Sequence, residues 1–142
     1  MFFSRILVAF DGSDLARKAL DKAMEIGKID SRIRIDVIYV IKMHTAPCAG
    51  LDGFEALEEA IYQQGEEMIA EVQQMLSEIS NYSKTYLLKG LSPAYIILNH
   101  AKEYNSDLII MGNRGLSGLK EFLGSVSHTV VQEAPIPVLI IK

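Results

Sequence analysis

The segment ILVAFDGSD, residues 6–14, establishes the type of fold that this chain adopts. Its apolar run ILVAF is typical of a strand buried on both faces of a parallel sheet. The run stops at Asp11 and Gly12, where a tight turn is expected. Ser13 is a favourable N-cap, and Asp14 suits the positive end of a helix dipole. The segment therefore predicts a buried strand that turns directly into a helix.

The alternation of strand and helix continues to the end of the chain. Further apolar runs predict strands, and apolar residues at helical spacing predict the helices between them. The expected strands are residues 6–10, 33–41, 85–88, 107–111 and 138–141. The expected helices run from Asp14 to about Gly27, from Phe54 to Ile79, from Pro93 to Tyr104, and from near Ser125 to before Pro135.

A chain in which strands and helices alternate in this way is expected to form one α/β domain over residues 1–142. Each connection is long enough to return the chain to the same edge, so we expect a mostly parallel five-stranded sheet with helices on both faces. Two strand orders, 2-1-3-4-5 and 3-2-1-4-5, fit this pattern. In both orders the ends of the first and fourth strands share a crevice, where ligands bind in such folds.

The composition restricts the partners and the compartment. Lysine and arginine number 14 against 18 acidic residues, and the net charge of −4 argues against nucleic-acid binding or a polybasic membrane anchor. No apolar run approaches the roughly 18 residues of a membrane span, and the first residues do not resemble a signal peptide. The single cysteine, Cys48, cannot form an internal disulfide and is expected to be a free loop thiol. We therefore expect a cytoplasmic protein.

The most informative segment for function is GNRGLSGLKEFLGSVS, residues 112–127. Its glycines permit close backbone approaches that a Cβ would block, so successive N–H groups can converge on an anion. Gly124 and Ser125 would begin a helix whose unpaired N–H groups and dipole also favour a phosphate. The pattern matches neither the P-loop nor the dinucleotide fingerprint. By spacing alone, the glycines are equally compatible with plain turns.

Side chains in the same segment could assist an anion. The hydroxyls of Ser125 and Ser127 could donate hydrogen bonds, and Arg114 and Lys120 could neutralise charge. His128 is the only histidine near this segment, and a surface or packing role is expected for it. The segment offers no dedicated base, which hydrolysis would require to orient a water.

The whole chain resembles the universal stress protein family. The resemblance is carried by residues 6–13, the Gly-x-x-Pro pattern at Gly90 and Pro93, DLIIMG at 107–112, the glycine-rich segment 112–127, and PIPVLI at 135–140. It implies a Rossmann-like fold of the adenine nucleotide alpha hydrolase type, with strand order 3-2-1-4-5.

The glycine-rich segment carries most of the loop pattern found in the ATP-binding branch of that family. That pattern is Gly, two residues, Gly, nine residues, Gly, and Ser or Thr. Gly112, Gly115 and the pair Gly124-Ser125 match it, but the spacer between Gly115 and Gly124 has eight residues. The resemblance therefore implies ATP binding by a loop that is one residue short.

The resemblance also implies a role for each residue around the crevice. Asp11 would hydrogen-bond the adenosine, apolar residues would surround the base, and the end of the fourth strand would lie beside the ribose. Backbone N–H groups would hold the triphosphate, which brings Mg²⁺ or Mn²⁺ bound through phosphate oxygens and water. The expected cofactor-binding residues are Ala9, Phe10, Asp11, Val40, Met111, Gly112, Arg114, Gly115, Gly124, Ser125, Val126 and Ser127. Two alternatives stay open: Asp11 could be only a turn or cap residue, and Val40 and Met111 only core residues.

These features favour an ATP-binding regulatory module that shifts a conformational or assembly equilibrium. Without a dedicated base, no more than slow ATP hydrolysis is expected. The resemblance further implies a homodimer formed through the C-terminal strand, residues 138–141, which would otherwise leave an exposed edge. The main alternative is a nucleotide-free dimeric scaffold, which the short spacer supports. A phospho-receiver based on Asp11 is disfavoured because no acidic pair lies beside it.

Overall fold

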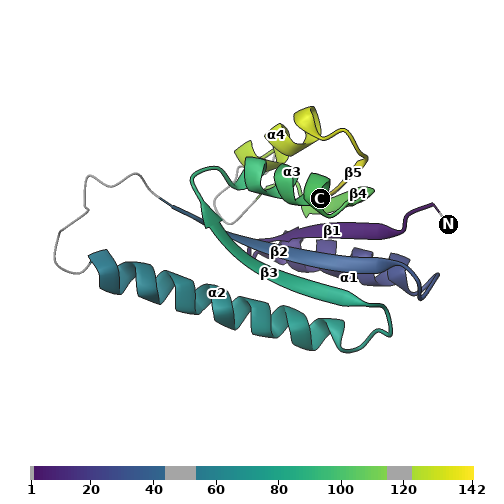
Figure 1. Cartoon of the computed structure of the whole chain (residues 1–142), viewed down its shortest axis with the longest axis horizontal. Helices are drawn as coiled ribbons and strands as arrows, with labels where there is room; N and C mark the ends of the chain where they lie inside the picture. Colours follow the sequence, from purple (N-terminus) through teal and green to yellow (C-terminus); the bar gives the residue numbers. More distant parts are fainter. Residues whose placement is uncertain (1, 44–53, 115–122) are drawn as a thin grey trace.

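The computed structural model describes residues 2–43, 54–114 and 123–142, in which strands and helices alternate (Figure 1). The strands are β1 Arg5–Phe10, β2 Arg34–Lys42, β3 Ser83–Gly90, β4 Leu108–Gly112 and β5 Val138–Ile141. The helices are α1 Asp14–Gly27, α2 Phe54–Leu76, α3 Pro93–Glu103 and α4 Ser125–Glu133. The expectations for Cys48, Gly115 and Lys120 concern residues outside the described ranges. Within those ranges, no helix has both the length and the apolar character needed to span a bilayer.

The five strands form one parallel sheet in the order β3-β2-β1-β4-β5. The central strand β1 pairs with β2 on one side and with β4 on the other, so that Ile6 lies opposite both Ile35 and Leu108. The predicted α/β architecture and the order 3-2-1-4-5 are therefore confirmed, and the order 2-1-3-4-5 is not adopted. Strand order reverses between β1 and β4, which places the switch point of the fold there.

Helices cover both faces of the sheet, with α1 and α2 on one side and α3 and α4 on the other (Figure 1). Alternate residues of β1 contribute to the two cores, because Val8 packs with α1 and α2 while Leu7 packs with α3 and α4. Both side chains are fully buried. This burial on two faces explains why the first strand appears in the sequence as a continuous apolar run.

Two elements differ from the expectation by more than one residue at an end. Helix α2 ends at Leu76 rather than Ile79, because the N–H groups of Glu78 and Ile79 bond to carbonyls three residues back in a tighter turn. Strand β3 covers residues 83–90 rather than 85–88 and pairs with β2 along its whole length. Because β3 lies at an edge of the sheet, polar residues are tolerated at its ends, and an apolar pattern underestimates its length.

Candidate functional site

A cavity of about 580 Å³ opens at the carboxyl ends of β1, β2 and β4. This volume is within the range of about 300 to 1,000 Å³ that is usual for small-molecule sites. It is lined by Ala9, Phe10, Asp11, Ser13, Ala16, Ile38, Val40, Lys42, Pro93, Ile97, Met111, Gly112, Arg114, Leu123, Gly124, Ser125, Val126 and Ser127. Every residue predicted for the site lines this cavity except Gly115, which lies outside the described residues.

The cavity occupies the switch point of the sheet, and the topology explains why these residues meet. Val8 of β1 lies between Val37 of β2 and Ile110 of β4, so the next residues of all three strands end at the same edge. The starts of α1, α3 and α4 border the same edge, since Ser13, Pro93 and Ser125 all line the cavity. Parallel strands and right-handed crossovers place strand ends and helix starts together in this way.

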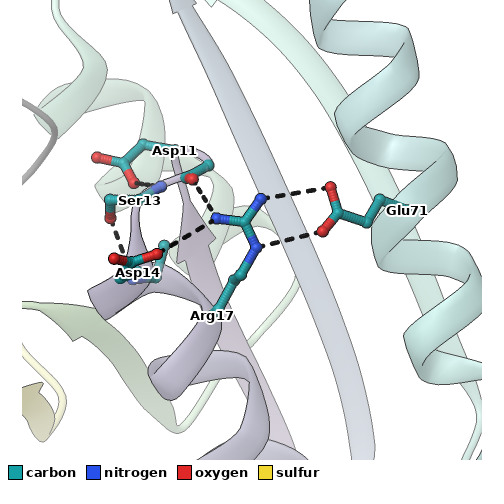
Figure 2. A network of polar contacts seen from close by, with 7 residues as sticks. Asp11, Ser13, Asp14, Arg17 and Glu71 are labelled. Atoms are coloured by element: carbon teal, nitrogen blue, oxygen red, sulfur yellow. Dashed lines mark hydrogen bonds and ion pairs between the residues drawn. The ribbon is translucent and has the colours of Figure 1, made fainter.

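The turn after β1 forms one wall of the cavity. Figure 2 shows the polar contacts of this turn. The Ser13 N–H donates to Asp11 Oδ1 at 2.9 Å, and the Ser13 hydroxyl accepts from the Ala16 N–H at 3.1 Å. Gly12, between them, has a φ of 84°, which a residue with a side chain rarely adopts. Asp11 therefore stabilises the turn with its Oδ1 and also lines the cavity. Its predicted roles as a turn residue and as a cavity residue are compatible.

The opposite wall is formed where the glycine-rich segment leaves β4 and where it joins α4. The Gly124 N–H and the Ser127 hydroxyl both donate to the Asn113 carbonyl at 2.7 Å, and the Asn113 N–H donates to the Ile141 carbonyl at 2.9 Å. Asn113 therefore ties the end of β4 to the start of α4 and to β5. The Ser127 side chain is buried, and in this structure its hydroxyl closes the base of the loop.

Gly112 is required by packing at the end of β4. A Cβ at this position would lie 2.8 Å from the Cβ of Leu15 and 3.3 Å from the Arg114 carbonyl oxygen. Leu15 belongs to the first turn of α1, so the start of that helix lies directly against β4. The glycine lets the walls of the cavity approach each other closely.

The amino end of α4 borders the cavity, and the N–H groups of its first two residues have no partner among the described residues. Its N-cap is Gly124, which has no side chain to accept from the first N–H groups, and its first turn contains no acidic residue. The first backbone bond of the helix runs from the His128 N–H to the Gly124 carbonyl at 2.9 Å. The N–H groups of Ser125 and Val126 come before this bond, where the positive end of the helix dipole favours an anion.

The charge of the cavity differs in sign from that of the whole chain. Among the described lining residues, Lys42 and Arg114 are basic and Asp11 is acidic, whereas the chain carries a net charge of −4. The Arg114 Nη1 donates to Asn113 Oδ1 at 3.0 Å, which holds the guanidinium near the loop base. Burial and, to a smaller extent, the Asp11 carboxylate raise the pKa of Tyr39 on β2. The cavity therefore favours a ligand with negative charge.

Sequence reasoning missed several lining residues. Lys42 was missed because the apolar pattern ended the second strand at Ile41, although a cation just beyond a strand end is a recognisable signal. Ser13 was predicted only as a helix cap, and Ile97 only as part of a helix. Asn113, which does not line the cavity but ties β4 to α4, was missed because it acts chiefly through its backbone, which leaves no side-chain pattern. His128, expected to be a surface or packing residue, is exposed and does not line the cavity.

No group of three or more histidine, cysteine, aspartate or glutamate side chains among the described residues is arranged to hold a metal ion. Asp11 is the single carboxylate among the described lining residues. Any divalent cation at this site would therefore depend mainly on oxygen atoms of the ligand and of water.

A parallel sheet of order 3-2-1-4-5 with a ligand-sized cavity at its switch point defines a Rossmann-like α/β protein. The sequence profile of the Universal stress protein family matches residues 2–142, and the chain belongs to this family.

Individual relatives agree with this assignment over nearly the whole chain. The Universal stress protein YxiE of Bacillus subtilis is 35% identical over 149 residues, which cover 99% of each chain. The structure of universal stress protein UspA from Lactobacillus plantarum has a TM-score of 0.87 at 26% identity and covers 100% of this chain and 99% of that one. The universal stress protein from Archaeoglobus fulgidus in complex with dAMP has a TM-score of 0.70 at 24% identity, with 100% of both chains covered, and shares the fold.

Proposed function

We propose that this protein is an ATP-binding regulatory module of the universal stress response that acts as a homodimeric switch. The observation that carries the proposal is the cavity, in which the Asp11 turn, apolar strand ends and the uncapped amino end of α4 face one space. The dAMP held by the Archaeoglobus fulgidus protein supports an adenine nucleotide as the class of ligand.

The lining of the cavity suggests how the nucleotide lies. Ile38, Val40 and Ile97 form an apolar part that suits an adenine ring. Asp11 offers a carboxylate to the sugar or base, and backbone donors of Ser125 and Val126 suit the phosphates. Arg114 and Lys42 add the positive charge that a triphosphate needs, and Mg²⁺ or Mn²⁺ would arrive with the phosphates.

The lining favours binding and regulation over catalysis. Among the described residues, no histidine lines the cavity: His100 is a buried residue of α3, and His128 is exposed on α4. Asp11 already accepts a hydrogen bond from the turn, which ties its carboxylate to a structural role. Since hydrolysis needs a group that orients a water, any ATP hydrolysis is expected to be slow.

Nucleotide binding is tested by denaturing the purified protein, analysing the released small molecules, and titrating ATP with Mg²⁺ by calorimetry. We expect adenine nucleotide in the released fraction or a saturable heat of binding. Arg114→Gln should weaken ATP binding roughly tenfold or more, because a charge-assisted hydrogen bond contributes about 1.5 to 3 kcal/mol. Lys28→Gln removes an exposed charge outside the cavity lining and is the matched control.

The competing function is a nucleotide-free dimeric scaffold with the same fold. It is favoured by the eight-residue spacer between Gly115 and Gly124, where the ATP-binding pattern has nine. The same experiment decides between the two functions. Absence of bound nucleotide together with no heat at millimolar ATP would replace the ATP proposal by the scaffold.

A further inference from the structure

Arg17, in the first turn of α1, connects the cavity wall to α2 (Figure 2). Its Nη1 donates to the Gly12 carbonyl at 2.5 Å, while its Nε and Nη2 donate to Glu71 Oε1 and Oε2 at 3.2 and 3.4 Å. A weaker ion pair joins Nη1 to Asp14 Oδ1 at 3.9 Å. One guanidinium therefore holds the turn after β1 and the carboxylate of a helix more than fifty residues away in the sequence.

We propose that Arg17 is a positioning residue that couples occupation of the cavity to the docking of α2. The inference rests on the proposed nucleotide site, because the coupled event is ligand binding at the Asp11 turn. The guanidinium is planar and its donors form a rigid fork, so it cannot follow a movement of Gly12 without altering its contact with Glu71. If a bound ligand shifts the turn, the Arg17 side chain transmits that shift to Glu71 on α2.

Two further contacts join the turn after β1, Arg17 and α2. The Sδ of Met68 on α2 is 3.4 Å from where a Cβ of Gly12 would be, so the helix packs directly against the turn. The Arg17 Cζ lies 6.0 Å from the centre of the Phe10 ring, and Phe10 lines the cavity. The turn, the guanidinium and one face of α2 therefore form a continuous packed unit.

The position of Glu71 along α2 determines which part of the helix this contact affects. Residues 55–64 are exposed, whereas Val72 and Leu76 are buried in the core that α2 shares with α1. The helix reaches the sheet at the buried Gly65, and Met68 and Glu71 follow one and two turns later, in the part of α2 that packs on the body of the protein. A ligand that fixes the turn should therefore strengthen the attachment of α2, and by linkage a firmly attached α2 should favour the ligand.

Hydrogen exchange read by mass spectrometry tests the coupling in the full-length protein. In the wild type, saturating Mg²⁺-ATP should slow exchange in residues 65–76 by about fivefold or more, the size of a typical coupling. In Glu71→Gln, ATP should still protect the turn after β1, but the protection of residues 65–76 should fall below about twofold. Glu67→Gln, which changes an exposed glutamate of the same helix, is the matched control and should behave as the wild type.

Affinity provides a second measurement that a purely structural role would not reproduce. Arg17→Gln should weaken ATP binding about fivefold, and Arg17→Lys should restore part of it because an ammonium can retain one of the two contacts. Combining Arg17→Gln with Glu71→Gln should cost no more than Arg17→Gln alone, since both changes break one link. Lys18→Gln, an exposed charge in the same helix, should leave the affinity unchanged.

The outcomes separate this inference from the proposed function. If ATP binds and residues 65–76 exchange at the same rate with and without it, the coupling is wrong and the nucleotide site stands. If ATP does not bind, the proposed function fails, and the ligand-free proteins still test the link. There, Glu71→Gln should speed exchange in the turn, residues 11–17, at least about twofold relative to Glu67→Gln. Equal rates in these two variants would overturn the role of Arg17.

Discussion

At the scale of single residues, His100 stands out as a buried ionisable group away from the cavity. It is 4% exposed, and its ring packs against those of Tyr86 and Tyr104, with centroid distances of 4.3 and 4.4 Å. Its Nε2 is buried and has no hydrogen-bond partner among the described residues. The nearby Asp36 is already bound by two arginines, Arg5 at 2.8 Å and Arg34 at 3.0 Å. A protonated His100 would therefore be poorly stabilised in the folded state.

Burial lowers the pKa of His100 below its usual 6.5, and the opposing effects of Asp36 and Glu103 are smaller. The unfolded chain therefore takes up a proton near pH 6.5, and the folded chain does so only at lower pH. We predict that the free energy of unfolding falls as the pH is lowered from 7 towards 5. Urea unfolding at several pH values should show this loss in the wild type and a smaller loss in His100→Gln.

His128→Gln is the control for the pH experiment, because His128 is an exposed histidine on α4. Its removal should leave the pH dependence as in the wild type. If His100→Gln and His128→Gln retain the same pH dependence as the wild type, burial of His100 does not determine the response to acid.

At the scale of elements, the first turn of α4 has two roles that a single substitution can separate. Ser125→Asp places a carboxylate at the positive end of the helix dipole, which should raise the free energy of unfolding by about 0.3 to 1 kcal/mol. The same carboxylate lies on the cavity wall and should repel phosphates, so ATP affinity should fall. Thermal unfolding of Ser125→Asp should therefore show a higher stability than the wild type, whereas calorimetric titration should show a lower ATP affinity.

Gln132→Asp is the matched control at the other end of α4, where Gln132 is exposed in the last turn. A negative charge there opposes the dipole and should lower stability slightly while leaving ATP affinity unchanged. A Ser125→Asp protein that binds ATP as tightly as the wild type would show that the phosphates do not lie at the amino end of α4.

The elements also show what the sequence can and cannot predict. Buried strands such as β1 were predictable because burial on both faces demands a continuous apolar run. Asp11 and Gly112 were predictable as neighbours because carboxyl ends of adjacent parallel strands meet at one edge. The contact between Arg17 and Glu71 was not predictable, because it joins two half-buried side chains of different helices and neither residue belongs to a local pattern.

At the scale of the whole molecule, one segment carries acidic residues and no basic residue. Residues 54–83 contain no lysine or arginine, and this segment includes all of α2. The two cations among the described cavity residues are Lys42, the last residue of β2, and Arg114, which follows β4. Charges separated by more than a Debye length, about 10 Å at 0.1 M salt, are largely screened. A nucleotide in the cavity is therefore expected to respond to its local cations more than to the net charge.

A second feature of the whole molecule is the edge of the sheet at β5, which in the described sheet pairs only with β4. The carbonyls of Pro137 and Ile141 accept from the N–H groups of β4 and the residue after it, at 3.1 and 2.9 Å. Because backbone groups alternate in direction along a strand, those of Val138 and Ile140 point away from β4. An apolar edge with unpaired backbone groups is a template for another strand, and this supports the proposed homodimer.

The dimer proposal can be tested with one charge on that edge. Leu139 is 37% exposed, so Leu139→Lys should fold and should place like charges opposite each other if two copies of β5 pair. Sedimentation analysis at micromolar concentration should give a dimer for the wild type and a monomer for Leu139→Lys. Ile29→Lys changes a more exposed apolar residue in the turn between α1 and β2 and should remain dimeric. A wild type that sediments as a single monomeric species would exclude β5 pairing and leave any ATP-dependent switch within one chain.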